Sequence, residues 1–123
     1  MNPYILAARQ AVESQYDGIC NIIEHQKVKD PKTKKSNFIE NVVKEEQACK
    51  VSYEDIYVNT ETETQSKVVT KIKLFIAPEL DIKPGSKIVV TQKGRTTEYK
   101  NSGEPAIYDT HQEIMLEKFK EWA

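Results

Sequence analysis

The alternation of apolar and polar positions is clearest in the second half of the chain, where it predicts a β-hairpin. Four β-branched residues, IVVT, precede the pair Lys93-Gly94, and the strand formers TTEY follow it. A two-residue turn at this pair places Ile88 opposite Tyr99. Because side chains alternate between the two faces of a strand, Val90 joins these two residues on one apolar side of the hairpin.

Two segments nearer the N-terminus have the pattern of a second antiparallel pair. Residues 19–26 are predicted to form a strand that is partly apolar on both faces, which indicates burial, and residues 38–47 return as its partner. The segment between them, KVKDPKTKKSN at residues 27–37, contains a proline and five lysines and almost no apolar residue. Such a composition is typical of a long loop.

The longest predicted strand covers residues 65–76, with an apolar face and a lysine-lined face. It is preceded by a second predicted loop at residues 54–65, EDIYVNTETETQ, which is rich in Thr and Glu. The exception within this loop is the apolar run Ile56, Tyr57 and Val58. Such a run has the composition to pair with the strand edge of another chain.

The N-terminus has the start signal of a helix. Asn2 is a good N-cap, and Pro3 suits the first helical position, where its missing N–H has no cost. The predicted N-terminal helix lies within residues 1–16, and its narrow apolar stripe leaves Arg9 outside; the stripe consists of Ile5, Ala8, Val12 and Tyr16. This stripe either covers the body of the fold or docks on a neighbouring protein, and the pattern fits both.

Length and composition narrow the classes further. The 123 residues contain no repeat or low-complexity tract, so we expect a single domain over residues 1–123. No apolar run approaches the roughly 20 residues of a membrane span. The N-terminus lacks the basic and apolar regions of a secretory signal, so we expect synthesis in the cytoplasm and no membrane partner.

Charge is balanced overall but uneven along the chain. With 18 basic and 19 acidic residues, the protein lacks the basic excess of most DNA-binding proteins. The basic residues are nevertheless concentrated in the predicted loop 27–37, which carries Lys27, Lys29, Lys32, Lys34 and Lys35. This cluster is either a solvated hairpin tip or a surface for phosphates.

Catalytic signatures are missing from the sequence. It contains neither a Gly-rich phosphate loop nor a nucleophile elbow, and its cysteines and histidines lack the two-residue spacing of structural zinc sites. Cys20 and Cys49 are expected to be free, buried thiols. His111 and Glu113 share a face if they lie on a strand, but no nucleophile accompanies this pair. We therefore predict no catalytic, metal or cofactor site.

Residues 78–113, PELDIKPGSKIVVTQKGRTTEYKNSGEPAIYDTHQE, and residues 45–53, EEQACKVSY, carry a resemblance to a known family. They resemble the minor capsid, or head-closure (stopper), proteins of the head-to-tail connector in tailed phages and prophages of Gram-positive bacteria. The resemblance extends from about Tyr16 to the C-terminus. It implies a mainly β fold, a small antiparallel β-barrel with an N-terminal α-helix and long loops. It also favours a strand through about Leu116, where periodicity alone is ambiguous.

The resemblance also implies a function. Subunits of this family form a homo-oligomeric ring below the portal and adaptor rings, close the DNA exit channel after packaging, and present the surface that tail-terminator or tail proteins join. For this chain it implies assembly in the host cytoplasm and a final place at the head-tail interface of the virion. Because the chain is highly charged and has no large apolar run left for an obligate interface, we expect a monomer when it is alone. The five loop lysines would then contact packaged double-stranded DNA without sequence preference, and residues 56–58 would contact a neighbouring subunit or the adaptor.

Two alternatives from other classes remain open. One is a small β-barrel binding module, OB-like or SH3-like, for a peptide or single-stranded nucleic acid. Its distinguishing feature is a set of exposed aromatic side chains beside basic residues, for which the sequence offers Tyr99 and Phe75. The other is a hydrolase or metal enzyme.

Overall fold

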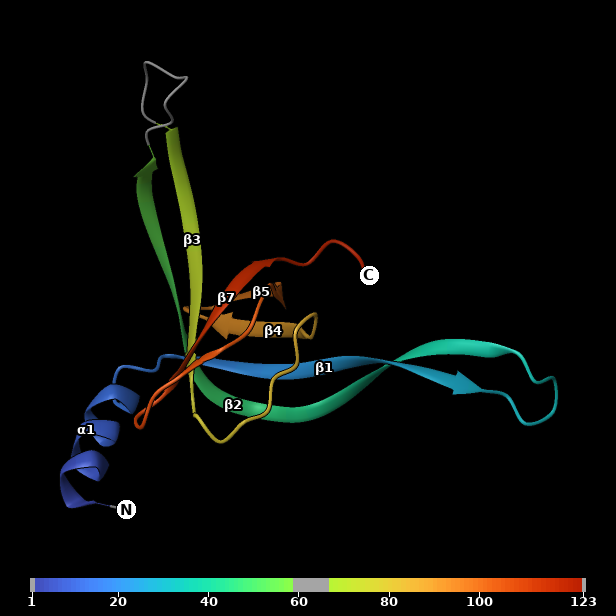
Figure 1. The fold of residues 1–123 in the computed structure, drawn as a ribbon, viewed down its shortest axis with the longest axis horizontal. Helices are drawn as coiled ribbons and strands as arrows, with labels where there is room; N and C mark the ends of the chain where they lie inside the picture. The colour runs from blue at the N-terminus through green and yellow to red at the C-terminus, as the bar shows by residue number, and fades with distance from the viewer. Residues whose placement is uncertain (1, 59–66, 123) are drawn as a thin grey trace.

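A computed structural model describes residues 2–58 and 67–122 and shows a mainly β chain with one helix near its N-terminus (Figure 1). The elements are, in order, α1 (Pro3–Glu13), β1 (Gly18–Lys29), β2 (Ser36–Val58), β3 (Lys67–Ile76), β4 (Lys87–Gln92), β5 (Arg95–Asn101), β6 (Ala106–Ile107) and β7 (Gln112–Lys118). No helix in the described part of the chain has the length and apolar character needed to cross a bilayer.

The antiparallel strands pair in a closed ring. β1 pairs with β2, β2 with β3, β3 with β7, β7 with β5, β5 with β4, and β4 again with β1, while the short β6 adds to β7. The core lies inside this ring and includes Ile22, Leu74, Ile76, Ile88 and Ile114, each at most 1% exposed. The expected mainly β, antiparallel fold is therefore confirmed.

The β4–β5 hairpin has the predicted register. Gln92 pairs with Arg95, and Ile88 pairs with Tyr99. Lys93 and Gly94 both have positive φ, 52° and 75°, as a two-residue turn that matches the strand twist requires.

Two hairpins extend beyond the ring in different directions, and β2 runs through both of them (Figure 1). The first, here called the basic arm, consists of residues 24–41 and joins β1 to β2. The second arm consists of residues 53–58 and 67–72, where β2 pairs with β3. Two register shifts interrupt the β1–β2 pairing near the root of the basic arm, between Cys20 and Ile23. Bulges of this kind bend and twist a strand, which suits a strand that leaves the ring at both ends.

The two predicted loops are shorter in the structure than expected. Regular pairing in the basic arm continues to Lys29 and Ser36, so the connecting segment is residues 30–35 and not 27–37. In the second arm, β2 continues through residues 54–58, and residues 59–65 of the predicted loop lie outside the described residues. The error arose because an exposed two-stranded ribbon is held by backbone hydrogen bonds and needs no apolar alternation, so its polar residues resemble a loop.

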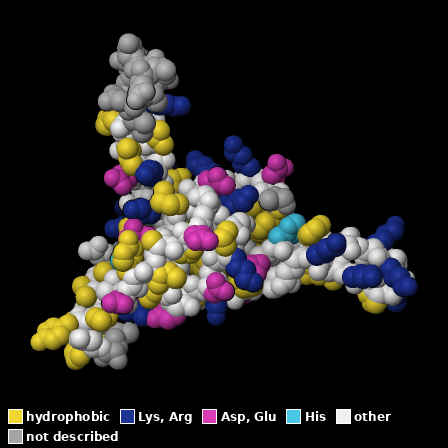
Figure 2. All heavy atoms as spheres, in the orientation of Figure 1, with side chains coloured by type: hydrophobic (Ala, Val, Ile, Leu, Met, Phe, Trp, Pro, Cys, Tyr) yellow, Lys and Arg dark blue, Asp and Glu magenta, His cyan; other side chains and the backbone are white. Residues whose placement is uncertain are grey.

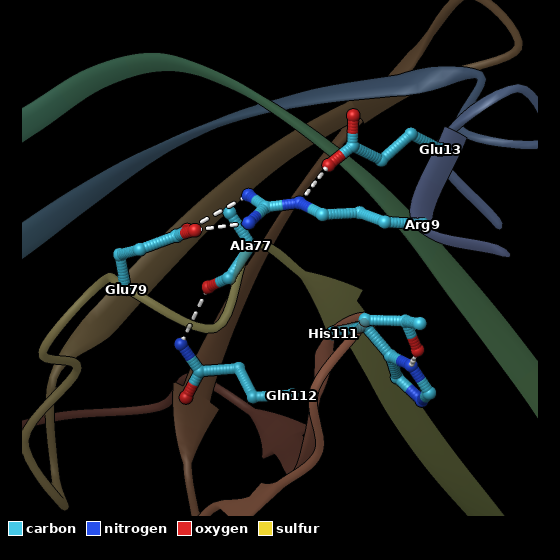
Figure 3. Close-up of polar contacts among 7 residues, drawn as sticks. Arg9, Glu13, Ala77, Glu79, His111 and Gln112 are labelled. Carbon is cyan, nitrogen blue, oxygen red and sulfur yellow. Dashed lines mark hydrogen bonds and ion pairs between the residues drawn. The ribbon is translucent and has the colours of Figure 1, made fainter. Parts of the chain in front are cut away.

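Helix α1 begins as predicted, with the Asn2 side chain accepting a hydrogen bond from the N–H of Tyr4 at 2.8 Å. Ile5, Val12 and Tyr16 are half-buried. The prediction was wrong about Ala8, which is exposed, and about Arg9, which faces inward. The guanidinium of Arg9 bonds to Glu79 in the β3–β4 connection and to Glu13 on the helix (Figure 3), so an ion pair completes the inner side of α1.

Candidate functional site

The lysines of the basic arm lie at its far end, where Figure 2 shows a cluster of dark blue side chains. Lys27 and Lys29 are on β1, and Lys32, Lys34 and Lys35 are in the connecting segment; all five are exposed. Within residues 2–58 and 67–122, the ion pairs involve none of these five amines. The structure therefore brings the predicted residues together as a cationic surface without local carboxylate partners.

The tip that presents these lysines is an ordered turn. The N–H of Lys34 donates to the carbonyl of Asp30 at 2.8 Å, and the N–H of Asp30 donates to the carbonyl of Lys35 at 2.9 Å. The carboxylate of Asp30 accepts from the N–H of Lys32 at 2.8 Å, and this hydrogen bond lowers the pKa of Asp30. The single acidic group of the tip is thus committed to the backbone, and the amines remain available.

The apolar run of the second arm lies on a strand and not in a loop. Ile56 pairs with Val69, Tyr57 with Val68, and Val58 with Lys67. Ile56 is half-buried, but Tyr57 is 74% exposed and Val68 is 53% exposed. The second arm therefore carries apolar side chains in solvent, and their predicted contact with a neighbouring subunit or adaptor stays a prediction.

A column of stacked aromatic rings stands at the root of the basic arm. Phe38 stacks on His25, and His25 stacks on Trp122, each with ring centroids 4.6 Å apart and with interplanar angles of 29° and 13°. Phe119 contacts the edge of Trp122 at 5.0 Å. Residues far apart in the sequence thus meet at one place, where the C-terminal segment packs against the β1–β2 hairpin.

A carboxylate fixes this aromatic column to the ring of strands. Glu40 accepts hydrogen bonds from the indole N–H of Trp122 at 3.2 Å and from the amine of Lys87 at 3.1 Å. Both hydrogen bonds lower the pKa of Glu40, and the bond from Lys87 has the larger effect. The amine of Lys87 also lies 4.7 Å from the ring centroid of Phe119. The charged pair of Glu40 and Lys87 therefore connects the aromatic column to β2 and β4.

Sequence reasoning missed this column because its members are not adjacent in any single pattern. His25 and Phe38 lie on diagonal positions of neighbouring strands, since Lys27 is the direct partner of Phe38 and Glu40 that of His25. Aligning the two strands in sequence is enough to predict this diagonal contact. The contact of Trp122 cannot be predicted in this way, because it depends on where the chain runs after β7.

The aromatic residues expected to be exposed lie elsewhere. Tyr99, a candidate for the binding-module alternative, is only 3% exposed and belongs to the core with Ile88 and Val90, as its place on the apolar side of the hairpin predicted. Burial, together with a hydrogen bond between its hydroxyl and that of Tyr53, raises the pKa of Tyr99 to about 12. Phe75 is half-buried beside His111, with ring centroids 5.7 Å apart.

The pair His111 and Glu113 shares a face, as predicted. The Nε2 atom of His111 lies 3.0 Å from a carboxylate oxygen of Glu113, and its Nδ1 atom lies 2.8 Å from the hydroxyl of Thr110. The amine of Lys73 binds the other oxygen of Glu113 at 3.1 Å. The contacts of His111 and then of Lys73 lower the pKa of Glu113. Both nitrogens of the imidazole therefore have partners within the protein.

The cysteines and histidines do not converge. Cys20 and Cys49 are free and buried in the core, where a hydrogen bond from the Cys20 thiol to Cys49, together with burial, raises the pKa of Cys20. His25 stands in the aromatic column, and His111 lies near helix α1 (Figure 3). Among the described residues, no group of three or more His, Cys, Asp and Glu side chains is placed to hold a metal ion.

Comparison with known proteins gives a fold similarity. No family model matches the sequence, and no curated protein matches it. The fold is similar to the solved structure of the phage-like element PBSX protein xkdH from Bacillus subtilis, with a TM-score of 0.53 and 13% sequence identity. The similarity covers 85% of this chain and 96% of that chain. The two proteins therefore share a fold over nearly the whole of the solved chain.

Proposed function

We propose that this protein is a structural component of a tailed phage or prophage, and specifically the head-closure subunit of its head-to-tail connector. One observation carries the proposal: the fold similarity to a protein of a phage-like element covers 96% of that chain. The sequence resemblance of residues 45–53 and 78–113 to head-closure proteins supports the same conclusion.

The two arms suit a subunit that works in a ring around DNA. The two long hairpins extend well beyond the small ring of strands (Figure 1). In such a ring, the basic arm of each subunit points toward the channel and the second arm contacts a neighbouring subunit or the adaptor. Repeating the arm around the channel multiplies a modest charge per subunit into a collar of cations for phosphates.

The exposed surface accounts for a monomer that assembles only on its partners. Tyr57 and Val68 are one exposed cross-strand pair on a narrow ribbon and do not form a broad apolar interface. We therefore propose that portal and adaptor rings act as the template, that tail-terminator or tail proteins bind the completed ring, and that assembly takes place in the host cytoplasm. Light scattering on the purified protein should give the mass of a monomer, and a stable ring without partners would contradict this template model.

The lysines of the tip provide the direct test in the phage or prophage that encodes the protein. The gene is deleted, then supplied as wild type or with Lys32, Lys34 and Lys35 changed to Glu. The variant should fold normally, because these side chains are exposed and surface changes usually alter stability by less than about 0.5 kcal/mol. Heads should fill with DNA and then leak it or remain without tails.

A matched control separates position from charge. Changing Lys44, Lys93 and Lys120 to Glu gives the same change in net charge at exposed sites outside both arms. Counts of DNA-filled heads, tailed particles and nuclease-accessible DNA should be normal for the control. Normal DNA retention and tail joining by the tip variant would remove the basic arm from head closure. Normal particles after deletion of the gene would overturn the proposed function itself.

A further inference from the structure

The aromatic column ends in an exposed ring. Trp122 and His25 form its inner layers, and Phe38 is the outermost layer, with 61% of its surface exposed. One face of the Phe38 ring is stacked on His25. The other face is therefore free to take one more flat ring in the same column.

Cations flank this free ring. Lys27 is the direct cross-strand partner of Phe38, so both side chains emerge on the same side of the basic arm. Lys29 follows two residues later and lies on that side as well. A hollow of about 360 Å3 beside the column is lined by His25, Phe38 and Trp122, and also by Lys83 and Glu24, whose amine and carboxylate pair with each other at 3.7 Å. The cations that remain for phosphates are therefore Lys27 and Lys29. An apolar stacking surface and two ammonium groups are thus found within one small area.

This combination matches an unpaired nucleotide. A nucleobase stacks on aromatic side chains without sequence preference, while lysines bind the phosphates on either side of it. Base pairs inside a duplex have both faces covered by their neighbours, and taking a base out of the stack costs free energy. A duplex can therefore use the lysines, whereas a single strand or a frayed end can use both the lysines and the ring.

We infer that the basic arm binds single-stranded DNA, with a base stacked on Phe38 and phosphates at Lys27 and Lys29. This inference deepens the proposed function and rests on it for the presence of DNA at the basic arm. It adds a preference that non-specific phosphate contact does not give: the arm distinguishes an unpaired DNA end from duplex DNA. The end of a duplex offers such a base when its terminal pair opens.

The test compares two DNA probes on the purified, full-length protein. One probe is a short oligothymidine, and the other is a duplex closed by loops of abasic linker at both ends, which presents no free base. Trp122 is the single tryptophan of the chain, so its fluorescence reports directly on the column. Wild-type protein should bind oligothymidine more tightly than the closed duplex, and Trp122 fluorescence should change on binding the single strand.

Substitutions then assign the preference to the ring. Phe38→Ala should weaken oligothymidine binding about 5-fold or more, the factor that corresponds to the weakest base-aromatic stacking, and leave duplex binding unchanged. Phe38→Tyr should retain the preference. The control is Ile39→Ala, because Ile39 is 47% exposed on the opposite side of the same strand and pairs with Gln26. Circular dichroism checks that each variant is folded.

The outcomes separate this inference from the proposed function. If the tip variant with Lys32, Lys34 and Lys35 changed to Glu loses affinity for both probes while Phe38→Ala loses none, stacking is refuted and the phosphate contact stands. If wild-type protein binds neither probe, the inference is wrong, whereas head closure is judged separately by the gene deletion. If Phe38→Ala binds DNA normally but fails to enter the connector ring, the partner of Phe38 is a protein and the inference is wrong.

Discussion

The ring of strands is completed at one end by a side chain, and removing that side chain is the sharpest test of the fold. β1 begins at Gly18, opposite Cys49. Beyond Cys49, β2 therefore has no partner strand on the side where β1 was. There Val51 is bound by Gln92, the last residue of β4. The N–H of Val51 donates to the amide oxygen of Gln92 at 2.8 Å, and the amide nitrogen of Gln92 donates to the carbonyl of Val51 at 3.1 Å. The amide thus replaces a strand backbone.

Gln92→Ala removes both hydrogen bonds at once. Val51 is 5% exposed, so its backbone groups lose their partner in a place that water reaches poorly. Leaving a buried donor or acceptor without a partner costs about 1–3 kcal/mol each. Because the Gln92 side chain is itself only half-buried, the expected total is toward the lower end, about 2–4 kcal/mol of lost unfolding free energy.

Urea unfolding followed by Trp122 fluorescence and by circular dichroism measures this loss. The midpoint should fall with little change in the slope, since the substitution weakens the folded state without altering how much surface unfolding exposes. Gln10→Ala is the control, because Gln10 is exposed on α1, and it should stay within about 0.5 kcal/mol of wild type. A loss below about 1 kcal/mol for Gln92→Ala would show that the amide does not complete the ring.

Three further results are expected. Arg9→Ala removes the ion pair with Glu79 and should speed amide hydrogen exchange in α1 while leaving the strands protected; unchanged exchange would mean that packing alone holds the helix. Glu113→Gln should destabilise the protein at neutral pH. Because contacts lower the folded pKa of Glu113, its contribution is present above the unfolded pKa and is lost as pH falls through the folded pKa, so variant and wild type should converge in acid melts below about pH 4. Cys20 and Cys49 are buried thiols, so a thiol reagent should modify them only as fast as the protein unfolds; rapid reaction of the native protein would refute their burial.

The parts of the fold that sequence predicted are those governed by local chemistry. The β4–β5 register followed from the turn at Lys93-Gly94, because a two-residue turn leaves one alignment of the flanking strands. The start of α1 followed from Asn2 and Pro3 for a similar reason. The strand through Leu116 came from the family resemblance and is confirmed by β7.

The parts that sequence missed depend on contacts between distant segments. Arg9 was placed outside the apolar stripe of the helix because no residue near it in sequence indicates its ion pair with Glu79 in the β3–β4 connection. The lysines of the candidate site were found because all five lie within residues 27–35. Their neighbour Phe38 was not identified as part of a site, because its column needs Trp122 from the other end of the chain.

The two bulges at the root of the basic arm have a consequence for how the chain can vary in length. Between Cys20 and Ile23 the sum of paired residue numbers falls from 67 (20 plus 47) to 65 (23 plus 42), so two extra residues of β2 are absorbed. The 30–35 turn fixes the pairing within the arm, and the ring fixes the pairing at Gly18, so the bulges take up the difference between the two registers. Losing one of the two extra residues would leave Phe38 opposite Lys27 and would change the bend of the arm where it leaves the ring. A change of length at the bulges should therefore alter the direction of the arm and keep Phe38 beside His25.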